Sequence, residues 1–460
     1  MADFPAKSFI CITNKTDDIQ ETYILRRRVM RNRISRGLLC SLWLMLCASL
    51  PARADALAFL MDTQIATVRQ QLAQHQAPVQ TIEAWQALQR QADKALQHPL
   101  MSVTDKGMTP ASGSKHDYLS LSAYWWPDDS KGDGLPWVRR DGEVNPASKN
   151  QQSDGVRLAA FTADVQALTL AWYFSGEQRY ADKAIAQLHH WFIAPQTRMN
   201  PNLNFAQGVP GVADGRSSGV LDGRYFATRI VDSLIMLRQA PGWKASDEQA
   251  MQQWMTAYLH WLQTSKLAKK EAQAKNNHGN WYAVQVAGIA WYLQQPALIK
   301  QMVTLAESKL AYQLAADGSQ PAELARTRSF HYSYFNLQAL TALAELATKA
   351  DAGDLWHYQN AKQAGIIRAL DFMAPYTRDA RTWPYKSLDR VSVRLIPLLS
   401  LADNRLHDSR YQRLIQQAQF NSGNTQKGYE QDVERGAVIQ AQRETWLLSQ
   451  PHWQSLEKKR

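Results

Sequence analysis

The feature that most constrains the fold is a helical spacing of apolar residues, which recurs along most of the chain. Stretches of a dozen or more residues carry apolar side chains three and four positions apart, the spacing of one buried helix face. No stretch alternates apolar and polar residues for long enough to predict a half-buried strand. The predicted helices cover 81–96, 156–174, 180–192, 224–237, 247–263, 280–293, 296–314, 334–350, 354–373, 392–403 and 408–419.

Short polar connections join most of these helices, which favours stacked antiparallel helix pairs. We therefore expect an all-α fold, an α/α toroid or incomplete barrel of antiparallel helix hairpins, formed as a single domain by residues 55–460. Three stretches interrupt the pattern, at 100–150, 195–222 and 315–333. Because long irregular loops in a compact domain are more often functional than accidental, we expect them to lie at one end of the ring and form a cleft there.

The first 54 residues have a different pattern. Met30 is followed by three arginines, an apolar run over 37–50 and small residues up to Ala56. This order is typical of a secretory signal peptide with an A-x-A-like cleavage site, and the run is short for a membrane span. We expect residues 1–54 to be an N-terminal extension plus a signal peptide that starts at Met30. The protein is then periplasmic, or secreted, and has no membrane contact after cleavage.

Cysteine content and charge narrow the class of protein. All three cysteines precede residue 55, so the predicted mature chain has no disulfide, thiol nucleophile or cysteine metal site. Of the 52 Lys or Arg and 41 Asp or Glu, nine and four also precede residue 55, which leaves a net charge of +6. Export, this positive charge and a full chain with 16 Trp and 17 Tyr together favour an acidic polysaccharide as the partner. Export argues against nucleic acid, and a monomer is slightly favoured over an oligomer.

A first candidate site is the stretch "AKNNHGNWYAVQ" at 274–285. Asparagine at the start of a helix is a typical N-cap, so capping accounts for one asparagine, Asn276 or Asn280. It leaves Asn277 and His278 without a structural role. Both are therefore candidate functional residues.

A second candidate site is the stretch "ELARTRSFHYSYFNL" at 323–337. It places Arg326, Arg328, His331, Tyr332 and Tyr334 just ahead of an apolar helix. The plain alternative is a charged loop whose aromatic residues pack on that helix. Arginine holds a carboxylate with a planar fork, and tyrosine can transfer a proton when cations lower its pKa. The set therefore indicates a site for an acidic substrate.

The two longer loops supply candidate cleft walls. Aromatic faces there would stack on sugar rings and cations would meet carboxylates, although Trp125 and Trp126 would equally well pack the first loop onto the helices. The predicted substrate contacts are Lys115, His116, Tyr118, Trp125, Trp126, Arg216, Asn276, Trp281, Arg328, His331 and Tyr334.

Other catalytic classes have little support. The sequence has no H-x-x-x-H or H-E-x-x-H spacing, no G-x-S-x-G elbow and no phosphate-binding glycine loop. We predict no metal site and no cofactor. Two alternatives stay open: a polysaccharide-binding protein without catalysis, and a glycoside hydrolase that uses two carboxylates, drawn from Asp117, Asp214, Asp222 and Glu323.

Four stretches resemble, in the same order, successive motifs of the alginate lyase superfamily, whose members are α/α-toroid polysaccharide lyases. They are "KHDYLSLSAYWWPDDSKGDGLPWVRRDGEVNP", "MNPNLNFAQGVPGVADGR", "KNNHGNWYAVQ" and "ELARTRSFHYSYFNLQAL". The resemblance runs from about residue 100 to 375 and implies β-elimination on a uronic-acid polysaccharide. It implies that Asn277 and Arg326 bind the uronate carboxylate, that His278 neutralises it or acts as base, and that Tyr332 protonates the leaving oxygen.

One position departs from the best-known alginate-specific branch. The catalytic tyrosine of that branch aligns three positions after Tyr332, where this chain has Phe335, and phenylalanine cannot transfer a proton. The resemblance is therefore to a divergent branch in which an arginine and a tyrosine six residues apart do the work. Two pairs have that spacing, Arg326 with Tyr332 and Arg328 with Tyr334; we favour the first, because Tyr332 lies in the core of the motif. The expected substrate is a 4-linked uronic-acid polysaccharide, alginate-like or glucuronate-containing.

Overall fold

The computed structural model describes residues 56–418 and 431–449, which all belong to the compact unit Asp55–Arg460. The predicted N-terminal extension and signal peptide lie outside the described residues. No helix in the described part of the chain is long and apolar enough to cross a membrane.

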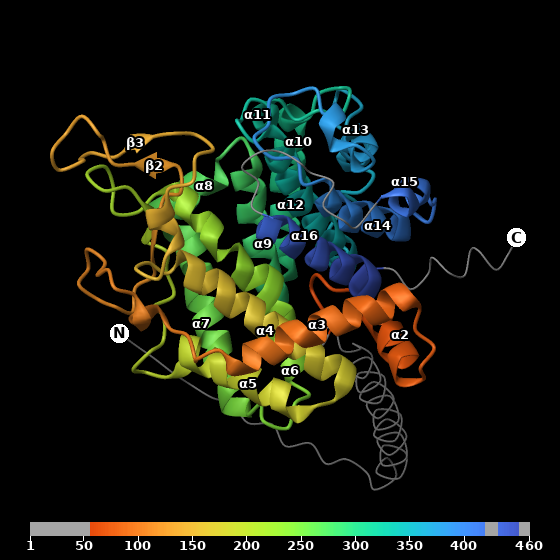
Figure 1. Ribbon diagram of the computed structural model, residues 1–460, viewed down its shortest axis with the longest axis horizontal. Helices are drawn as coiled ribbons and strands as arrows, with labels where there is room; N and C mark the ends of the chain where they lie inside the picture. Colours follow the sequence, from red (N-terminus) through yellow and green to blue (C-terminus); the bar gives the residue numbers. More distant parts are fainter. Residues whose placement is uncertain (1–55, 419–430, 450–460) are drawn as a thin grey trace, which may run out of the picture. The chain divides into compact units, whose positions relative to one another are not determined.

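Helices, most of them α-helices, form most of the described chain (Figure 1). They are α2 (Asp62–Ala73), α3 (Val79–Gln97), α4 (Gly155–Ser175), α5 (Gln178–Leu188), α6 (Asp232–Leu237), α7 (Ala245–Thr264), α8 (Lys266–Ala272), α9 (Asn277–Tyr292), α10 (Pro296–Gln313), α11 (Pro321–Leu324), α12 (Ser329–Ala350), α13 (Ile366–Met373), α14 (Leu395–Leu406), α15 (Gln412–Gln417) and α16 (Gln431–Arg443). π-Helical turns are η4 (His189–Ile193), η6 (Phe226–Val231) and η10 (Glu444–Ser449). The 3-10 turns are η2 (Val103–Asp105), η3 (Pro146–Lys149), η5 (Ser217–Gly223), η7 (Ala374–Thr377), η8 (Ala380–Thr382) and η9 (Ser392–Arg394).

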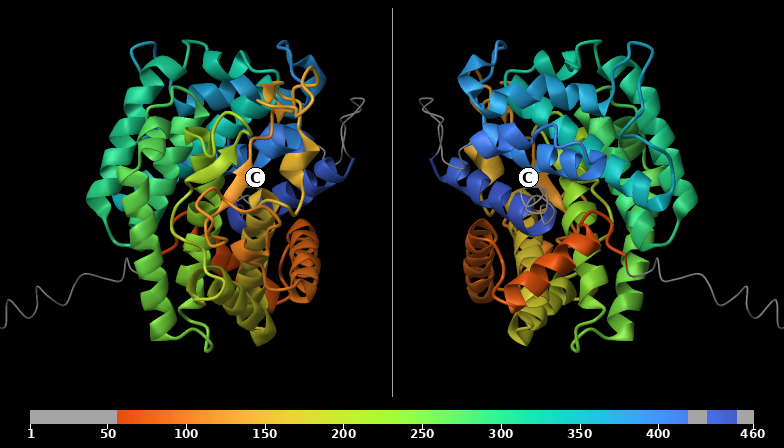
Figure 2. Two further views of the ribbon diagram at one scale, coloured as in Figure 1. Left: turned by 90° about the vertical axis from the view of Figure 1, so that its left-hand side faces the viewer. Right: turned by 90° about the vertical axis from the view of Figure 1, so that its right-hand side faces the viewer.

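Burial separates the helices into inner and outer ones. Nearly every residue of α9 is buried, and α12 is buried along most of its length, whereas α7 and α10 bury one face only. A helix that is apolar on all sides must be surrounded by other elements. Helix α9 accordingly packs against α10, α12 and η6, and α4 packs against α3 and α5 (Figure 2). Helix hairpins such as α4–α5 and α9–α10 thus repeat along the chain, and the predicted all-α fold is confirmed.

The three interrupting loops meet one another. Strand β1 (Leu119–Leu121) of the first loop pairs in parallel with β4 (Phe205–Gly208) of the second. Within the first loop, β2 (Trp125–Trp126) pairs antiparallel with β3 (Val138–Arg139). The third loop joins them through Thr327, whose hydroxyl donates to Asp141 of the first loop at 3.0 Å. The predicted clustering of these loops is therefore observed.

One predicted helix is wrong over half its length. The stretch 354–373 is helical only in α13, because the preceding residues form a turn around Asn360, whose Oδ1 accepts from the backbone N–H groups of Lys362 and Ala364. Gln363 adopts a positive φ of 59°, which a helix does not allow. The sequence reading also missed α2, α8 and α16, and it took the π turns η4 and η6 for ordinary helix.

Residues 57–60, near the beginning of the described chain, are held between the start of α6 and the C-terminal end of α12. The carboxylate of Asp232, the first residue of α6, accepts backbone N–H groups of Ala58, Phe59 and Leu60 at 2.6, 3.0 and 2.8 Å. Near the end of α12, the Lys349 ammonium donates to the carbonyl oxygens of Leu57, Ala58 and Leu60. We call this arrangement the basal clamp.

Candidate active site

The first candidate stretch begins helix α9. Asn276 is the N-cap, and its side-chain oxygen accepts the backbone N–H of His278 at 3.2 Å. Asn280 is buried inside the helix and donates to Gln313 and Asn336 instead. Of the two asparagines considered for capping, Asn276 fills that role.

Asn277 is held by a buried carboxylate from the other candidate stretch. Its backbone N–H donates to Oε1 of Glu323 at 2.6 Å, and its Nδ2 donates to Oε2 at 2.8 Å. Burial raises the pKa of Glu323, although both hydrogen bonds oppose the shift. The side-chain amide oxygen of Asn277, Oδ1, is buried and has no partner among the described residues. Glu323 therefore fixes the direction of an amide that retains hydrogen-bonding capacity.

His278 is oriented by a second buried carboxylate. Its Nδ1 lies 2.5 Å from Oε1 of Glu271, whose side chain is 4% exposed. A carboxylate only accepts hydrogen bonds, so Nδ1 is the donor in this contact, and Nε2 is the nitrogen that bears the lone pair when the imidazole is neutral. The histidine side chain is 18% exposed, which leaves Nε2 able to accept a proton from a bound molecule.

Arg326 and Tyr332 form a stacked pair. The guanidinium carbon lies 3.9 Å from the centroid of the tyrosine ring. Asp141 fixes the guanidinium, accepting from Nη2 at 2.9 Å and more weakly from Nε. Burial alone would raise the pKa of Asp141, but the hydrogen bonds from Arg326 and Arg139 hold it far below its usual range. The predicted pair is thus brought together by a first-loop residue that the sequence did not single out.

The phenol of Tyr332 has a hydroxyl neighbour. It donates to the hydroxyl of Tyr124 at 3.0 Å, and Arg328 donates weakly to the same Tyr124 oxygen. Arg328 itself is paired with Asp389. Burial raises the pKa of Tyr332, Tyr124 adds to the rise, and Arg326 opposes it. Tyr332 is accordingly a neutral phenol, a proton donor rather than a base in the unliganded protein.

Other predicted residues of α12 lie away from the Arg326–Tyr332 pair. His331, Tyr334 and Phe335 line a cavity of about 360 Å³ enclosed by α4, η6, α9, α12, α14 and α16. We call it the central pocket. Trp281 of α9 also lines it and packs on Phe335, with ring centroids 4.8 Å apart. Tyr334 therefore does not share the surroundings of Tyr332, and burial raises its pKa as well.

Comparison with known proteins decides the family. The family model described as "Alginate lyase" matches residues 102–383. The chain belongs to the alginate lyase family. It is accordingly a polysaccharide lyase, and the predicted resemblance is confirmed.

Solved structures agree with the family assignment. An alginate lyase from Bacteroides ovatus is 31% identical, with a TM-score of 0.75 over 83% of this chain and 98% of that chain. Alginate lyase A1-III from Sphingomonas species A1 is 14% identical, with a TM-score of 0.52 over 79% of this chain and 91% of that one. A variant of A1-III complexed with tetrasaccharide gives a TM-score of 0.53 at 15% identity, over 80% and 91% of the two chains. The two A1-III likenesses show the shared toroid fold alone. No curated protein sequence matches the chain.

Three predicted contacts in the first loop of this lyase have structural partners. The Lys115 ammonium donates to three backbone carbonyl oxygens, those of Lys106, Gly107 and Met108. Tyr118 is completely buried and donates to Asp222. His116 contacts the Arg198 carbonyl through Nδ1. The structure therefore does not place Tyr118 where a sugar could touch it, and it uses the Lys115 ammonium to hold the loop.

The tryptophan pair stays accessible. Trp125 and Trp126 form β2, both are partly exposed, and each carries a guanidinium over its ring at 5.2 Å, from Arg216 and Arg140 respectively. Arg216 also donates to Ser122, and burial lowers its pKa. Two loops thus join at an aromatic and cationic surface, which suits a sugar acid.

The carboxylates proposed for a hydrolase are mostly occupied. Asp117 accepts from Ser112, Asn200 and Asn202, while Asp222 accepts from Tyr118, Ser120 and Gln207. Glu323 holds Asn277, and Asp214 is exposed. These four therefore do not provide an acid and a base facing one another. Among the described residues there is also no group of three His, Cys, Asp or Glu that could hold a metal ion.

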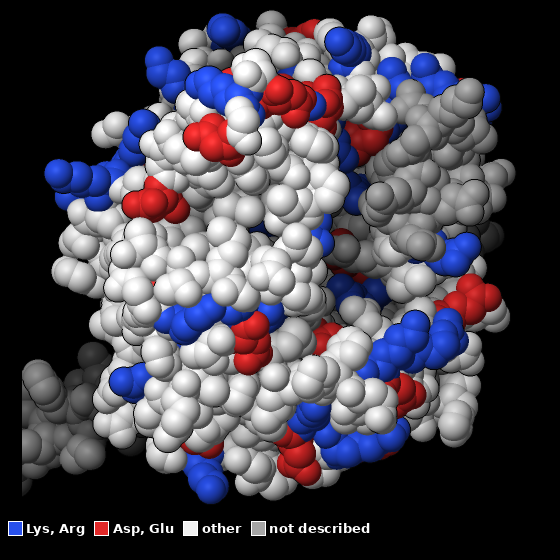
Figure 3. All heavy atoms as spheres, turned by 60° about the vertical axis from the view of Figure 1, so that its left-hand side comes forward, with Lys and Arg blue, Asp and Glu red and all other residues white. Residues whose placement is uncertain are grey.

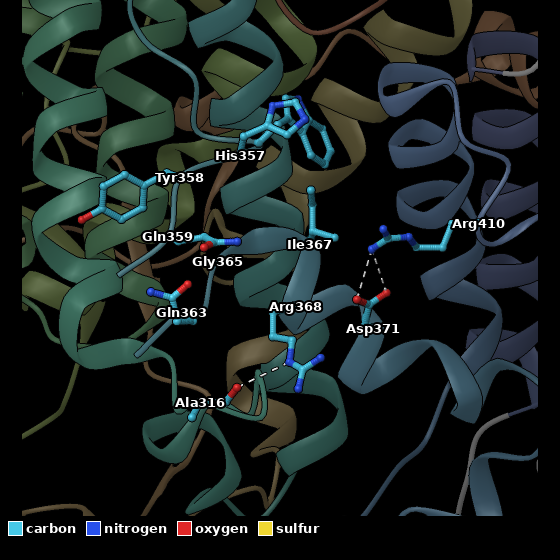
Figure 4. A pocket seen from close by; sticks show the side chains of 11 residues that line it. Ala316, His357, Tyr358, Gln359, Gln363, Gly365, Ile367, Arg368, Asp371 and Arg410 are labelled. Carbon is cyan, nitrogen blue, oxygen red and sulfur yellow. Dashed lines mark hydrogen bonds and ion pairs between the residues drawn. The ribbon is translucent and has the colours of Figure 1, made fainter. Parts of the chain in front are cut away.

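A second cavity, of about 500 Å³, lies elsewhere on the lyase. Its lining includes Ala316, His357, Arg368, Asp371 and Arg410, and Figure 4 shows Arg410 paired with Asp371 at its edge. None of the predicted site residues lines it, so we do not connect it with catalysis.

The residues that sequence reading missed are those that orient the site: Glu271, Asp141, Tyr124, Asp389 and Arg394. Each contacts a predicted residue from a distant part of the chain, except Glu271, which lies seven residues before His278. Tyr124 adjoins the conspicuous Trp125-Trp126 pair, which was the one usable indication in the sequence.

Proposed function

We propose that this lyase cleaves a polysaccharide of 4-linked uronic acids by β-elimination. The observation that carries the proposal is the guanidinium of Arg326 stacked on Tyr332, next to the start of α9. Glu323 supports that placement, because it holds Asn277 and lies only three residues before Arg326. Trp281 and Phe335, one turn into α9 and two turns into α12, touch each other and bring the two helix starts together.

The reaction makes specific demands on the protein. The proton α to the uronate carboxylate leaves, its electron pair forms a carbon–carbon double bond, and the bond to the 4-linked glycosidic oxygen breaks. That oxygen takes up a proton. Because the negative carboxylate disfavours removal of the α proton, fixed donors must neutralise it and stabilise the enolate-like charge.

The described contacts suit the following division of roles. Asn277 and Arg326 bind the carboxylate, each held by an acidic residue that leaves some N–H groups unused. His278, with Nδ1 committed to Glu271, takes the α proton on Nε2. Tyr332, a neutral phenol, gives its proton to the leaving oxygen.

The substrate class follows from charge and from the relatives. The matching structures are described as alginate lyases, and alginate is a polymer of uronic acids. Arg216 on Trp125 offers a cation and a flat ring in the adjoining loops. Phe335 lies where the alginate-specific branch has its tyrosine, so glucuronate-containing polymers belong in the test beside alginate.

The test is a panel of purified polyuronates with the ultraviolet absorbance of the new unsaturated uronate as readout. We expect absorbance to rise with at least one polymer. New reducing ends without this absorbance would indicate a hydrolase, and binding without either product would indicate a binding protein. Both outcomes would contradict the proposed elimination.

We also propose that the protein is exported to the periplasm. The proposal is based on the segment from Met30 to Ala56, which lies almost wholly outside the described residues. Cell fractionation and N-terminal sequencing of the mature protein test it. Recovery in the cytoplasm with residues 30–54 attached would contradict it.

A further inference from the structure

Four arginines line the central pocket and, among the described residues, make no hydrogen bond or ion pair with a carboxylate, although Glu444 attracts Arg229 and Arg443 from nearby. Arg224 precedes η6, Arg229 lies within it, Arg394 ends η9 and Arg443 ends α16. Within the described residues, their hydrogen-bond partners are all neutral: the Leu221 and Ala159 carbonyls, the Tyr225 and Thr162 hydroxyls, a His331 nitrogen, and the Gln91 and Gln166 amides. Arg326 and Arg328 of the candidate active site, in contrast, are both ion-paired.

The pocket has a surplus of positive charge. Its described acidic residues are Glu345 and Glu444, and Glu345 is already paired with Arg405 through two hydrogen bonds. His331 accepts from Arg394, and burial, Arg394 and Arg328 lower its pKa to about 3, so it is neutral. Arg443 is only 7% exposed, and its Nε has no described partner. Because an unpaired buried charge is costly, these guanidiniums indicate an anionic ligand.

Aromatic rings alternate with the cations. The Tyr225 ring lies between the guanidinium carbons of Arg224 and Arg229, at 4.0 and 4.1 Å from its centroid. Burial raises the pKa of Tyr225, but the two arginines lower it by more. Trp281 and Phe335 add further flat faces. Cations interleaved with aromatic rings suit sugars that carry carboxylates.

The pocket borders the candidate active site and reaches the basal clamp: the ring of His331, which lines it, lies 5.2 Å from the ring of Tyr332, which does not. Along α12 its lining runs from His331, the neighbour of Tyr332, to Glu345, fourteen residues further, about 20 Å of helix. Phe59, Leu60 and Met61 line it as well, and the clamp holds the first two by their backbone. Figure 3 shows a hollowed face of the molecule with Lys and Arg side chains inside the hollow.

We propose that the central pocket receives the end of the uronate chain, with Arg224 and Arg394 binding carboxylates of sugars beyond the one that is cleaved. The enzyme then releases short fragments from a chain end. This inference rests on the proposed function and adds to it where on the polymer cleavage occurs.

The kinetic test uses Arg224→Gln, Arg394→Gln and the double variant, with Arg368→Gln as matched control. Arg368 is exposed and lines only the second cavity. Wild type should produce short fragments from the start of a digest, with little early loss of viscosity. Since a hydrogen bond to a charged group is worth a factor of about ten or more, the double variant should raise the KM for short oligouronates at least that much and broaden its product lengths. Equal product lengths in wild type and the three pocket variants would overturn the proposal.

The binding test uses Tyr332→Phe to prevent turnover and calorimetry with a uronate trisaccharide, a neutral trisaccharide and inorganic phosphate. The uronate should bind, lose affinity about tenfold or more with Arg394→Gln, and regain most of it with Arg394→Lys. Similar circular dichroism of the last two variants excludes misfolding. Binding of phosphate but not of the uronate would overturn the proposal in favour of a general anion site.

The two proposals fail separately. If elimination occurs but product lengths do not change in the arginine variants, the proposed role of the central pocket is refuted and the proposed function stands. Uronate binding that depends on Arg394, without elimination products from any polyuronate, would refute the function and leave the pocket intact.

Discussion

The two ends of helix α12 both carry buried polar groups, but they use them differently. At its far end, Lys349 and the facing Asp232 spend their hydrogen bonds on the backbone of residues 57–60. Beside its start, the first turns of α9 keep unused capacity: the side-chain oxygen of Asn277 and the indole N–H of Trp281 are buried without a described partner. Since buried polar groups are normally satisfied, we propose that hydroxyl groups of a ligand complete the structure here, whereas at the far end the chain itself supplies the partners.

The largest effect expected from this contrast is the loss of activity at the start of α12. Tyr332→Phe removes the proton donor and His278→Ala removes the proposed base, so each should lower kcat by about a thousandfold or more. Neither substitution interrupts a helix, so helical circular dichroism should stay unchanged. Initial rates by ultraviolet absorbance measure the loss.

Tyr334→Phe is the matched control for Tyr332→Phe. It removes the same hydroxyl two residues along α12, from the central pocket and not from the Arg326 stack. Because Tyr334 lines the central pocket, Tyr334→Phe should act mainly on the KM, and its kcat should fall far less than the loss expected for a general acid. If Tyr334→Phe is inactive and Tyr332→Phe is active, the assignment of the acid passes to Tyr334.

The contrast also explains what the sequence could predict. Local patterns found the helices, and the Asn277–His278 and Arg326–Tyr332 pairs were found because their members are close in sequence and match family motifs. The partners that orient them were missed because Asp141 and Arg326 are 185 residues apart, and no local pattern reports such a contact. The prediction that Tyr118 contacts substrate was wrong for the same reason, because its buried hydroxyl donates to Asp222, 104 residues away.

The second prediction concerns the basal clamp. Asp232→Ala removes the buried carboxylate that attracts the Lys349 ammonium and leaves three backbone N–H groups unsatisfied, so the free energy of unfolding should fall by about 3 kcal/mol or more. Urea unfolding measures the loss. At a temperature where the variant is folded, kcat should stay near that of wild type, because the clamp lies at the far end of α12.

Asp379→Ala is the control for this variant. Asp379 pairs with Arg381 on the surface and caps η8, and its removal should lower the free energy of unfolding by no more than about 1 kcal/mol. A stable Asp232→Ala protein with impaired kcat would reverse the proposed division of labour between the two ends.

The smallest effect concerns pH and the unpaired cations around His331. Burial, Arg394 and Arg328 lower the pKa of His331 to about 3 in the folded protein, while Asp389 opposes the shift and Arg224 adds to it. In the unfolded chain its pKa is about 6.5. Between these values the unfolded chain binds a proton that the folded chain does not. Stability is therefore lost as the pH falls below about 6.5, by at most about 1.4 kcal/mol per pH unit.

His331→Gln removes this one linkage. The difference in unfolding free energy between pH 7 and pH 5 should become smaller by about 1–2 kcal/mol than in wild type, while exposed His357→Gln provides the matched loss of one histidine. Comparing slopes cancels the lost packing of His331 on Phe335, which affects both pH values alike. An equal slope in wild type and His331→Gln would mean that burial and the neighbouring arginines do not keep His331 neutral in the folded protein.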